Sequence, residues 1–298
     1  MRTESLVLLA AAAVGCSQPY VTPERLDRGL VIVLPGIEGR GHFNEAIADG
    51  LNDANVDCAI EIHDWTAPMG PVFNLRAEQR NRGKAAELAE RIAHYVVSHP
   101  DRPVVLVGQS GGGAMAAWTA EALPYGYRID GVIMLAPALS PGYLLDRTLA
   151  SSRRGVVNFY SHKDWAALGL GTTILGTMDG EHGSSAGRVG FDVPGARTGG
   201  QAYGRLFQVA WTEAVAASGN YGGHLTSGAR GFVARYVAPF VRSHRWNAEL
   251  VARVLRGEAG EPGSAPPVLE WAPLPPGGYG PTTQPAQPAQ GDAVGAGS

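Results

Sequence analysis

The chain has 298 residues, a mass of 31.2 kDa and a formal net charge of −3, which indicates one large α/β domain or two smaller domains. Hydrophobic residues make up 45% of it and charged residues 17%, so the composition excludes a disordered polyelectrolyte and a coiled coil. Its basic residues form no cluster, which predicts no nucleic-acid partner. The two cysteines, Cys16 and Cys58, can build neither a disulfide framework nor a thiolate zinc cage.

The first segment places Arg2 before an apolar run from Leu6 to Val14. This run is too short to cross a bilayer as a helix and is typical of an export signal. It ends at Ala-Val-Gly-Cys16, which resembles the lipobox of bacterial lipoproteins with alanine in the usual place of leucine. The resemblance implies a signal peptide over residues 1–16, lipidation of Cys16, and an exported envelope protein on the periplasmic side that meets the membrane only through its lipid anchor. Plain secretion and a buried N-terminal segment remain open.

After residue 16, short apolar runs alternate with helical patterns. Strands are predicted at Leu30–Leu34, Cys58–Ile62, Val104–Val107, Val132–Leu135, Val156–Tyr160 and Leu206–Trp211, and helices at Phe43–Asn55, Leu75–Val97, Gly112–Leu123 and Phe232–Val241. Continuous apolar strands separated by helices are typical of a parallel sheet that is covered on both faces. The sequence therefore predicts an α/β fold: a doubly wound, mostly parallel sheet of about six or more strands within residues 17–256.

The last segment, residues 257–298, contains nine Gly and nine Pro. Such a composition cannot bury enough apolar surface to offset the entropy that is lost on ordering. We therefore expect a disordered tail after the domain.

The pattern G-x-S-x-G occurs twice, around Ser110 and around Ser185. The first copy lies between the apolar run that ends at Val107 and a predicted helix, which is the strand, sharp turn and helix that expose a nucleophilic serine. The second copy has neither a strand before it nor a helix after it, so we expect it to be a loop. Because the first copy lacks the spacing of dinucleotide-binding and P-loop motifs, a nucleotide-binding turn is the weaker interpretation.

A serine nucleophile needs a base and a third group that orients this base. His224 lies in a Gly-rich loop after the last predicted strand and is our candidate base. Asp164 follows the strand that ends at Tyr160, where a carboxylate reaches the carboxyl edge of the sheet, and is our candidate acid. The rival carboxylates are Asp130, Asp179 and Asp192.

Backbone N–H groups that stabilise a developing oxyanion complete such a site. One donor is expected at Gly111, after the serine, and the other at Ile37, in the loop after the first strand. His63 and His162 follow strands and are candidates for lining the substrate pocket, although a structural role is the simpler interpretation. No spacing typical of metal ligands occurs, so the sequence predicts neither a metal nor a cofactor.

In these motifs and in the order serine, acid, histidine, residues 28–244 resemble the α/β-hydrolase family of esterases and lipases. The resemblance implies acyl transfer from a small-molecule substrate to water, with Ser110, Asp164 and His224 as the triad and no inferred protein partner. We expect hydrolysis of a carboxylic ester. Hydrolysis of a peptide or amide bond and a catalytically inactive, envelope-anchored binding protein remain the alternatives. Only about 18 residues, 138–155, separate two predicted strands where many members insert a cap, so we expect no large lid there.

Overall fold

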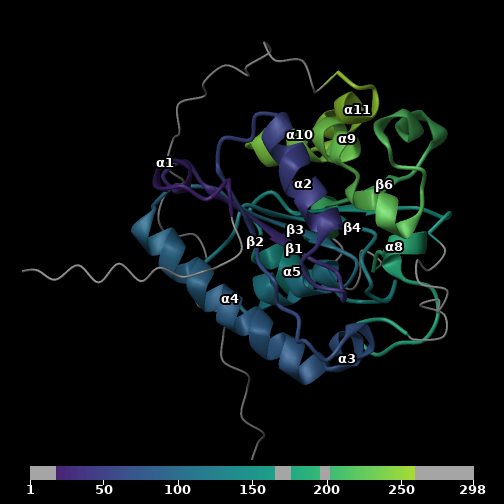
Figure 1. Cartoon of the computed structure of the whole chain (residues 1–298), viewed down its shortest axis with the longest axis horizontal. Coiled ribbons are helices and arrows are strands. Elements are labelled where there is room, and N and C mark those ends of the chain that lie inside the picture. Colours follow the sequence, from purple (N-terminus) through teal and green to yellow (C-terminus); the bar gives the residue numbers. More distant parts are fainter. Residues whose placement is uncertain (1–17, 165–175, 195–201, 259–298) are drawn as a thin grey trace, which may run out of the picture. The chain divides into compact units, whose positions relative to one another are not determined.

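A computed structural model describes residues 18–164, 176–194 and 202–258 (Figure 1). They belong to one unit that extends to Gly260. The predicted signal peptide with Cys16, and the tail from residue 259 onward, lie outside the described residues. None of the helices within the three described ranges has the length and hydropathy of a membrane span.

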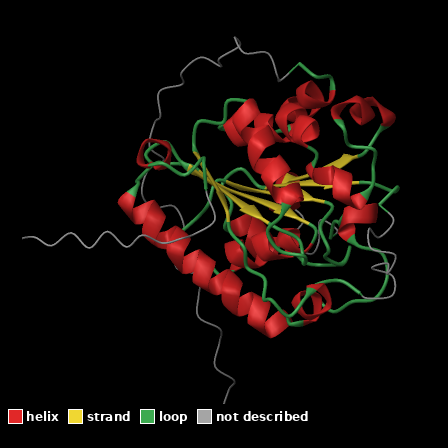
Figure 2. Cartoon of the chain, viewed as in Figure 1, coloured by secondary structure: helices red, strands yellow, loops and turns green. Residues whose placement is uncertain are grey.

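Six strands form one sheet in the order β2-β1-β3-β4-β5-β6, and every neighbouring pair is parallel (Figure 2). The strands are β1 (Leu30–Leu34), β2 (Ala59–Ile62), β3 (Val104–Gln109), β4 (Gly131–Leu135), β5 (Val156–Tyr160) and β6 (Leu206–Ala210). The strand order reverses direction beside β1 and β3, where ligands bind in open parallel sheets. The predicted α/β class and the six predicted strands are confirmed.

Helices and helical turns fill the connections between strands and follow the last strand. They are α1 (Pro23–Leu26), α2 (His42–Asp53), α3 (Pro71–Arg76), α4 (Glu78–Ser98), α5 (Gly111–Glu121), α6 (Asp146–Ala150), α8 (Ala186–Val189), η2 (Ala202–Arg205), η3 (Glu213–Ser218), η4 (His224–Gly228), α9 (Arg230–Phe232), η5 (Val233–Val237), α10 (Ala238–Arg242) and α11 (Ala248–Leu255). The β4–β5 connection contains only the five-residue α6, in agreement with the absence of a large cap there.

Successive strand residues point to opposite faces, so two apolar cores form. Leu30, Ile32 and Leu34 pack with residues of α4 and α5 on one face. Val31 and Val33 pack with residues of α2, η5 and α10 on the other face. Figure 1 shows these two helix groups on opposite sides of the strands. Because both faces are covered, the strands read as mostly apolar runs in the sequence, with polar residues such as Glu61 in β2, Asn158 in β5 and Gln208 in β6.

Two predicted helices differ from the structure. The helix predicted from Leu75 to Val97 is two helices, α3 and α4, that are separated at Ala77. The predicted closing helix contains the π-helical turn η5 directly before α10. Pro239 has no N–H to donate to the preceding turn, and a π turn is one way in which a helix accommodates such a loss. The final helix α11 was not predicted.

Candidate active site

Ser110 lies at a sharp turn between β3 and α5. Its backbone has φ 54° and ψ −121°, a conformation that is strained for any residue with a side chain. Three backbone hydrogen bonds of 3.0 Å hold it: Ser110 donates to the Leu135 carbonyl and accepts from the N–H groups of Gly113 and Ala138. The turn is therefore held from β4 and from the start of α5.

The two outer glycines of this motif are required because backbone groups approach them closely. A Cβ on Gly108 would lie 2.1 Å from the Gly112 carbonyl oxygen, and a Cβ on Gly112 would lie 2.0 Å from the Leu34 carbonyl oxygen. Both separations are far below van der Waals contact. Strand, turn and helix can therefore pack in this way only with glycine at both positions, as the motif predicts.

The second G-x-S-x-G copy is a different structure. Contrary to the prediction, a short helix, α8, follows Ser185. No strand precedes it among the described residues from 176 to 185. Gly187 instead packs against the backbone of Ala136, and its N–H donates to Pro137. This copy therefore packs a buried turn against the end of β4, and no histidine among the described residues forms a hydrogen bond with Ser185.

The structure brings the three predicted catalytic side chains together from three segments. The His224 Nε2 atom lies 2.7 Å from the Ser110 hydroxyl oxygen, and its Nδ1 atom lies 3.1 and 3.0 Å from the two carboxylate oxygens of Asp164. The side chains of His224 and Asp164 are 15% and 5% exposed, and Ser110 is 7% exposed. A neutral imidazole here can donate through Nδ1 to the carboxylate and accept the serine proton at Nε2.

The surroundings of His224 act on its pKa in opposite directions. Burial lowers this pKa, because it penalises the charged imidazolium. The hydrogen bond and the negative charge of Asp164 raise it, and the charge of Glu38 adds to them. The raising effects dominate, so the pKa of His224 lies above its usual value. The carboxylate thus stabilises the imidazolium that proton transfer from serine would create.

Asp164 takes its place through the turn after β5. Its N–H donates to the Ser161 carbonyl at 2.9 Å, and the Ser161 hydroxyl accepts from the N–H of Lys163 at 3.1 Å. These bonds bend the chain so that the Asp164 side chain faces His224.

The three rival carboxylates have other partners. Asp130 binds Arg154 at 3.1 Å at the opposite edge of the sheet, and Asp179 accepts from the N–H and hydroxyl groups of Ser140. Asp192 is exposed. Of the four candidates, the structure places Asp164 beside the histidine.

Polar side chains that sequence reasoning missed hold the His224 loop. Asn220, which is buried, accepts from the N–H of Gly222 at 2.9 Å and from the hydroxyl of Thr226 at 3.2 Å. The Trp211 indole N–H, at the end of β6, donates to the Asn220 carbonyl at 2.8 Å. The Ser227 hydroxyl donates to the carbonyl of His224 itself at 2.7 Å. Asparagine in a Gly-rich stretch is a turn signal, but nothing in its spacing points to the histidine.

The candidate oxyanion donors also lie together. A Cβ on Gly111 would lie 2.8 Å from the Ile37 side chain, so the loop after β1 contacts the start of α5. Asn74 donates to the Ile37 carbonyl at 2.9 Å and holds this loop. Neither the Gly111 nor the Ile37 N–H donates to another described residue. Both N–H groups at this junction are therefore without an acceptor among the described residues.

Neither of the other candidate histidines joins this cluster. His63 is half-buried, and its Nδ1 atom lies 3.7 Å from Glu61. His162 is exposed, and its ring lies nearly perpendicular to the Tyr160 ring. No cluster of residues that could hold a metal ion occurs among the described residues.

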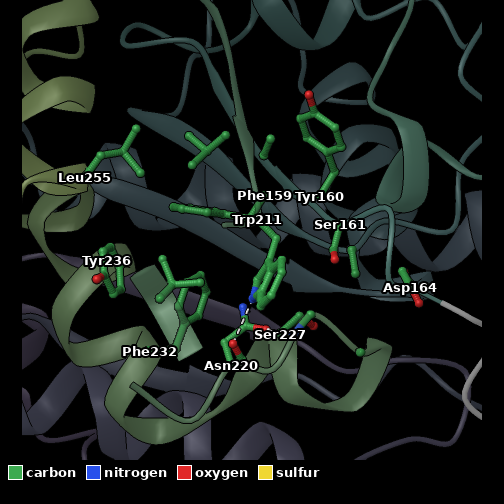
Figure 3. A pocket seen from close by; sticks show the side chains of 16 residues that line it. Phe159, Tyr160, Ser161, Asp164, Trp211, Asn220, Ser227, Phe232, Tyr236 and Leu255 are labelled. Atoms are coloured by element: carbon green, nitrogen blue, oxygen red, sulfur yellow. Dashed lines mark hydrogen bonds between the residues drawn. The ribbon is translucent and has the colours of Figure 1, made fainter. Parts of the chain in front are cut away.

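A small aromatic cavity of about 20 Å³, partly open to solvent, lies beside the acid (Figure 3). Phe159, Trp211, Phe232 and Tyr236 line it, and Asp164 lies at one end of it. Ser110 does not line this cavity, so it is separate from the reacting atoms. Its apolar wall instead backs the acid and the His224 loop.

No known protein-family model matches the sequence, and no curated protein does. Several solved structures share part of the chain path. The match to lipase B from Aspergillus fumigatus covers 80% of this chain and 61% of the lipase chain, at 14% identity and a TM-score of 0.47. This chain therefore spans less than two thirds of the length of that lipase. The match to esterase B from Lactobacillus Rhamnosis covers 78% of this chain and 79% of the esterase chain, at 11% identity and a TM-score of 0.44. The match to TT1662 from Thermus thermophilus covers 72% of this chain and 87% of the TT1662 chain, at 18% identity and a TM-score of 0.43.

The fold follows from the chain's own topology. Helices cover both faces of its six-stranded parallel sheet, and the strained serine turn joins the third strand to the helix that follows it. The acid follows a later strand, and the histidine lies in a loop after the last strand. This chain therefore has the α/β-hydrolase fold.

Proposed function

We propose that the protein is a serine hydrolase that cleaves a carboxylic ester through an acyl-enzyme. His224 takes the proton of Ser110 as the serine oxygen attacks the carbonyl carbon, and Asp164 holds the imidazole in the required tautomer. The N–H groups of Gly111 and Ile37 stabilise the oxyanion. His224 then gives the proton to the departing alcohol, and water repeats the sequence on the acyl-enzyme.

The observation that carries this proposal is the continuous hydrogen-bond path from Ser110 through His224 to Asp164. The strained serine conformation supports it, because strain of this kind clusters at functional sites. The proposed chemistry needs no cofactor.

Covalent labelling tests the proposal. A fluorophosphonate probe should label the purified protein, and peptide mapping should place the label on Ser110. Ser110→Ala should lose labelling and hydrolysis of p-nitrophenyl esters, whereas Ser185→Ala should keep both. Labelling on the Ser185 peptide, or unchanged ester hydrolysis by a folded Ser110→Ala variant, would contradict the proposed triad.

The same assay distinguishes the alternatives. Esters of graded acyl length define the acyl preference, and p-nitroanilides of the same acyl groups test amide cleavage. Faster cleavage of the anilides would identify an amide hydrolase. A folded protein that neither reacts with the probe nor turns over any of these compounds would be an inactive binding protein.

We further propose, on the sequence alone, that the protein is exported and lipidated at Cys16. Expression in a bacterial host should give a membrane-associated product, and Cys16→Ser should release it. Mass spectrometry that finds an intact Met1 or an unmodified Cys16 on native material would contradict lipidation, and a released, cleaved product would support plain secretion.

A further inference from the structure

Glu38 is an acidic side chain in the loop that supplies Ile37. It is exposed, and its carboxylate has no hydrogen bond or ion pair with another described residue. The side chain does not extend away from the loop: its two oxygens lie 2.5 and 2.6 Å from the position that a Cβ on Gly36 would occupy. The carboxylate therefore folds back over the residue that precedes Ile37.

This negative charge reaches the candidate active site. Ile37, the residue before Glu38, contacts the start of α5 at Gly111. The charge of Glu38 is also one of the influences that raise the pKa of His224. The carboxylate thus lies beside the residue that precedes the candidate oxyanion donor Ile37, and its charge acts on the candidate base.

The neighbouring charges do not neutralise Glu38. Asp64, at the end of β2, accepts from the Arg40 N–H at 3.1 Å and adds a second negative charge to this side. The Arg40 guanidinium lies 4.0 Å from Glu45 on α2. A negative charge beside an oxyanion hole opposes the charge that develops during acyl transfer. When the substrate is a neutral ester, the charge of Glu38 therefore makes the transition state of acyl transfer less stable.

We infer that the substrate itself supplies the compensating charge: an ester with a positively charged nitrogen close to its carbonyl, bound by Glu38. This inference rests on the proposed hydrolase function. A cation between Glu38 and the reacting carbonyl would pair with the carboxylate and cancel its repulsion of the oxyanion. Glu38 is then the residue that selects cationic over neutral esters.

Two isosteric pairs of esters test the inference. Butyrylcholine and 3,3-dimethylbutyl butyrate differ only in the ammonium nitrogen of the alcohol. The p-nitrophenyl esters of 4-(trimethylammonio)butanoate and 5,5-dimethylhexanoate place the same difference on the acyl side. The wild-type protein should prefer the cationic member of at least one pair by up to about fivefold in kcat/KM, because an exposed ion pair contributes up to about 1 kcal/mol.

Glu38→Gln should remove most of this preference, chiefly through a higher KM for the cationic ester. The neutral isostere should be cleaved at the same rate or faster, because the charge beside the oxyanion is gone. Glu181→Gln is the matched control: it removes an exposed carboxylate that lies outside the loop and does not pair with Arg40. It should leave the preference unchanged, and both variants should melt at the wild-type temperature.

The other outcomes overturn either the inference about Glu38 or the proposed hydrolase function. Equal cleavage of both members of both pairs, or a preference that survives Glu38→Gln, overturns the inference while the hydrolase proposal stands. An equal loss of the preference in Glu181→Gln would show that any nearby negative charge has the same effect, and would also overturn the inference. No turnover of any ester and no fluorophosphonate labelling of Ser110 overturn the proposed function, and the inference fails with it.

Discussion

Ser110 and His224 lie 2.7 Å apart, but two different kinds of interaction hold the segments that carry them. The serine turn is fixed by backbone packing, with Gly108 and Gly112 so close to neighbouring carbonyls that no side chain fits. The histidine loop is fixed by polar side chains, chiefly Asn220 and its hydrogen bonds. The turn is part of the core, whereas the loop is attached to it.

This difference has an energetic consequence. A clash with backbone in a packed core cannot relax, so a change in the turn should destabilise the whole domain. A lost hydrogen bond in the loop costs about 1 kcal/mol, which leaves the domain folded and displaces the imidazole. Variants of the turn glycines should therefore fail in folding, whereas variants of the loop should stay folded and fail in catalysis.

The largest expected effect is a loss of kcat in variants of His224, where the loop meets the serine turn. His224→Ala should lower kcat by about 10⁴-fold or more, and Asp164→Asn should lower it by up to about 10⁴-fold, because the amide fixes the wrong imidazole tautomer. The double variant should be little worse than His224→Ala, since residues that act as one unit are not additive. Initial rates on activated esters measure this, with the exposed His94→Ala on α4 as the control. Full additivity of the two losses would argue against a coupled unit.

Gly112→Ala should break the turn. The new Cβ would lie 2.0 Å from the Leu34 carbonyl oxygen, so we expect the free energy of unfolding to fall by about 4 kcal/mol or more, or no folded protein. Gly83→Ala is the matched control, because nothing lies within 4 Å of its Cβ in the middle of α4. It should stabilise the protein by about 0.5–1 kcal/mol. Urea denaturation measures both, and a Gly112→Ala variant of wild-type stability would contradict the packing argument.

Asn220→Ala should damage the loop and spare the fold. It removes the acceptor for the Gly222 N–H and the Thr226 hydroxyl, so we expect a loss of about 1–2 kcal/mol in stability. We expect kcat to fall by about tenfold or more, because a misplaced catalytic group costs far more than its contact energy. Tyr221→Ala, at an exposed position in the same loop, should change neither. Equal kcat values for the two variants would show that Asn220 does not position His224.

The same division explains what the sequence could predict. The strands and the serine turn were predictable, because apolar runs and glycines at Gly108 and Gly112 record backbone packing directly. The His224–Asp164 pair followed from chain order alone. The contacts of Asn220, Trp211 and Ser227 were not predictable, since hydrogen bonds between loop residues leave no periodic pattern. The turn η5 was missed because apolar residues continue through it from Phe232 to Val241. The break at Ala77 was missed because neither glycine nor proline marks it.

The smallest expected effect is on the pH dependence of kcat/KM. It tests the role of Asp164 separately from the loop that carries His224. Serine attack needs neutral His224, so activity should fall as the pH drops through the histidine pKa. Asp164 and Glu38 raise this pKa, so the fall should begin at a higher pH than for an isolated histidine. Asp164→Asn removes the main raising influence and should move the acid limb of kcat/KM to lower pH. Glu38→Gln should move it in the same direction by less.

The contribution of the His224–Asp164 pair to the free energy of unfolding should change with pH in the opposite direction to activity. Because the folded-state pKa of His224 is raised, the contribution of this pair is fully present below the unfolded pKa and is lost as the pH rises through the folded pKa. Activity therefore appears over the same pH range in which the imidazolium–carboxylate pair stops stabilising the fold. Rate profiles and urea midpoints measured across this range test both signs together. An acid limb that stays fixed in Asp164→Asn would show that a group other than His224 controls it.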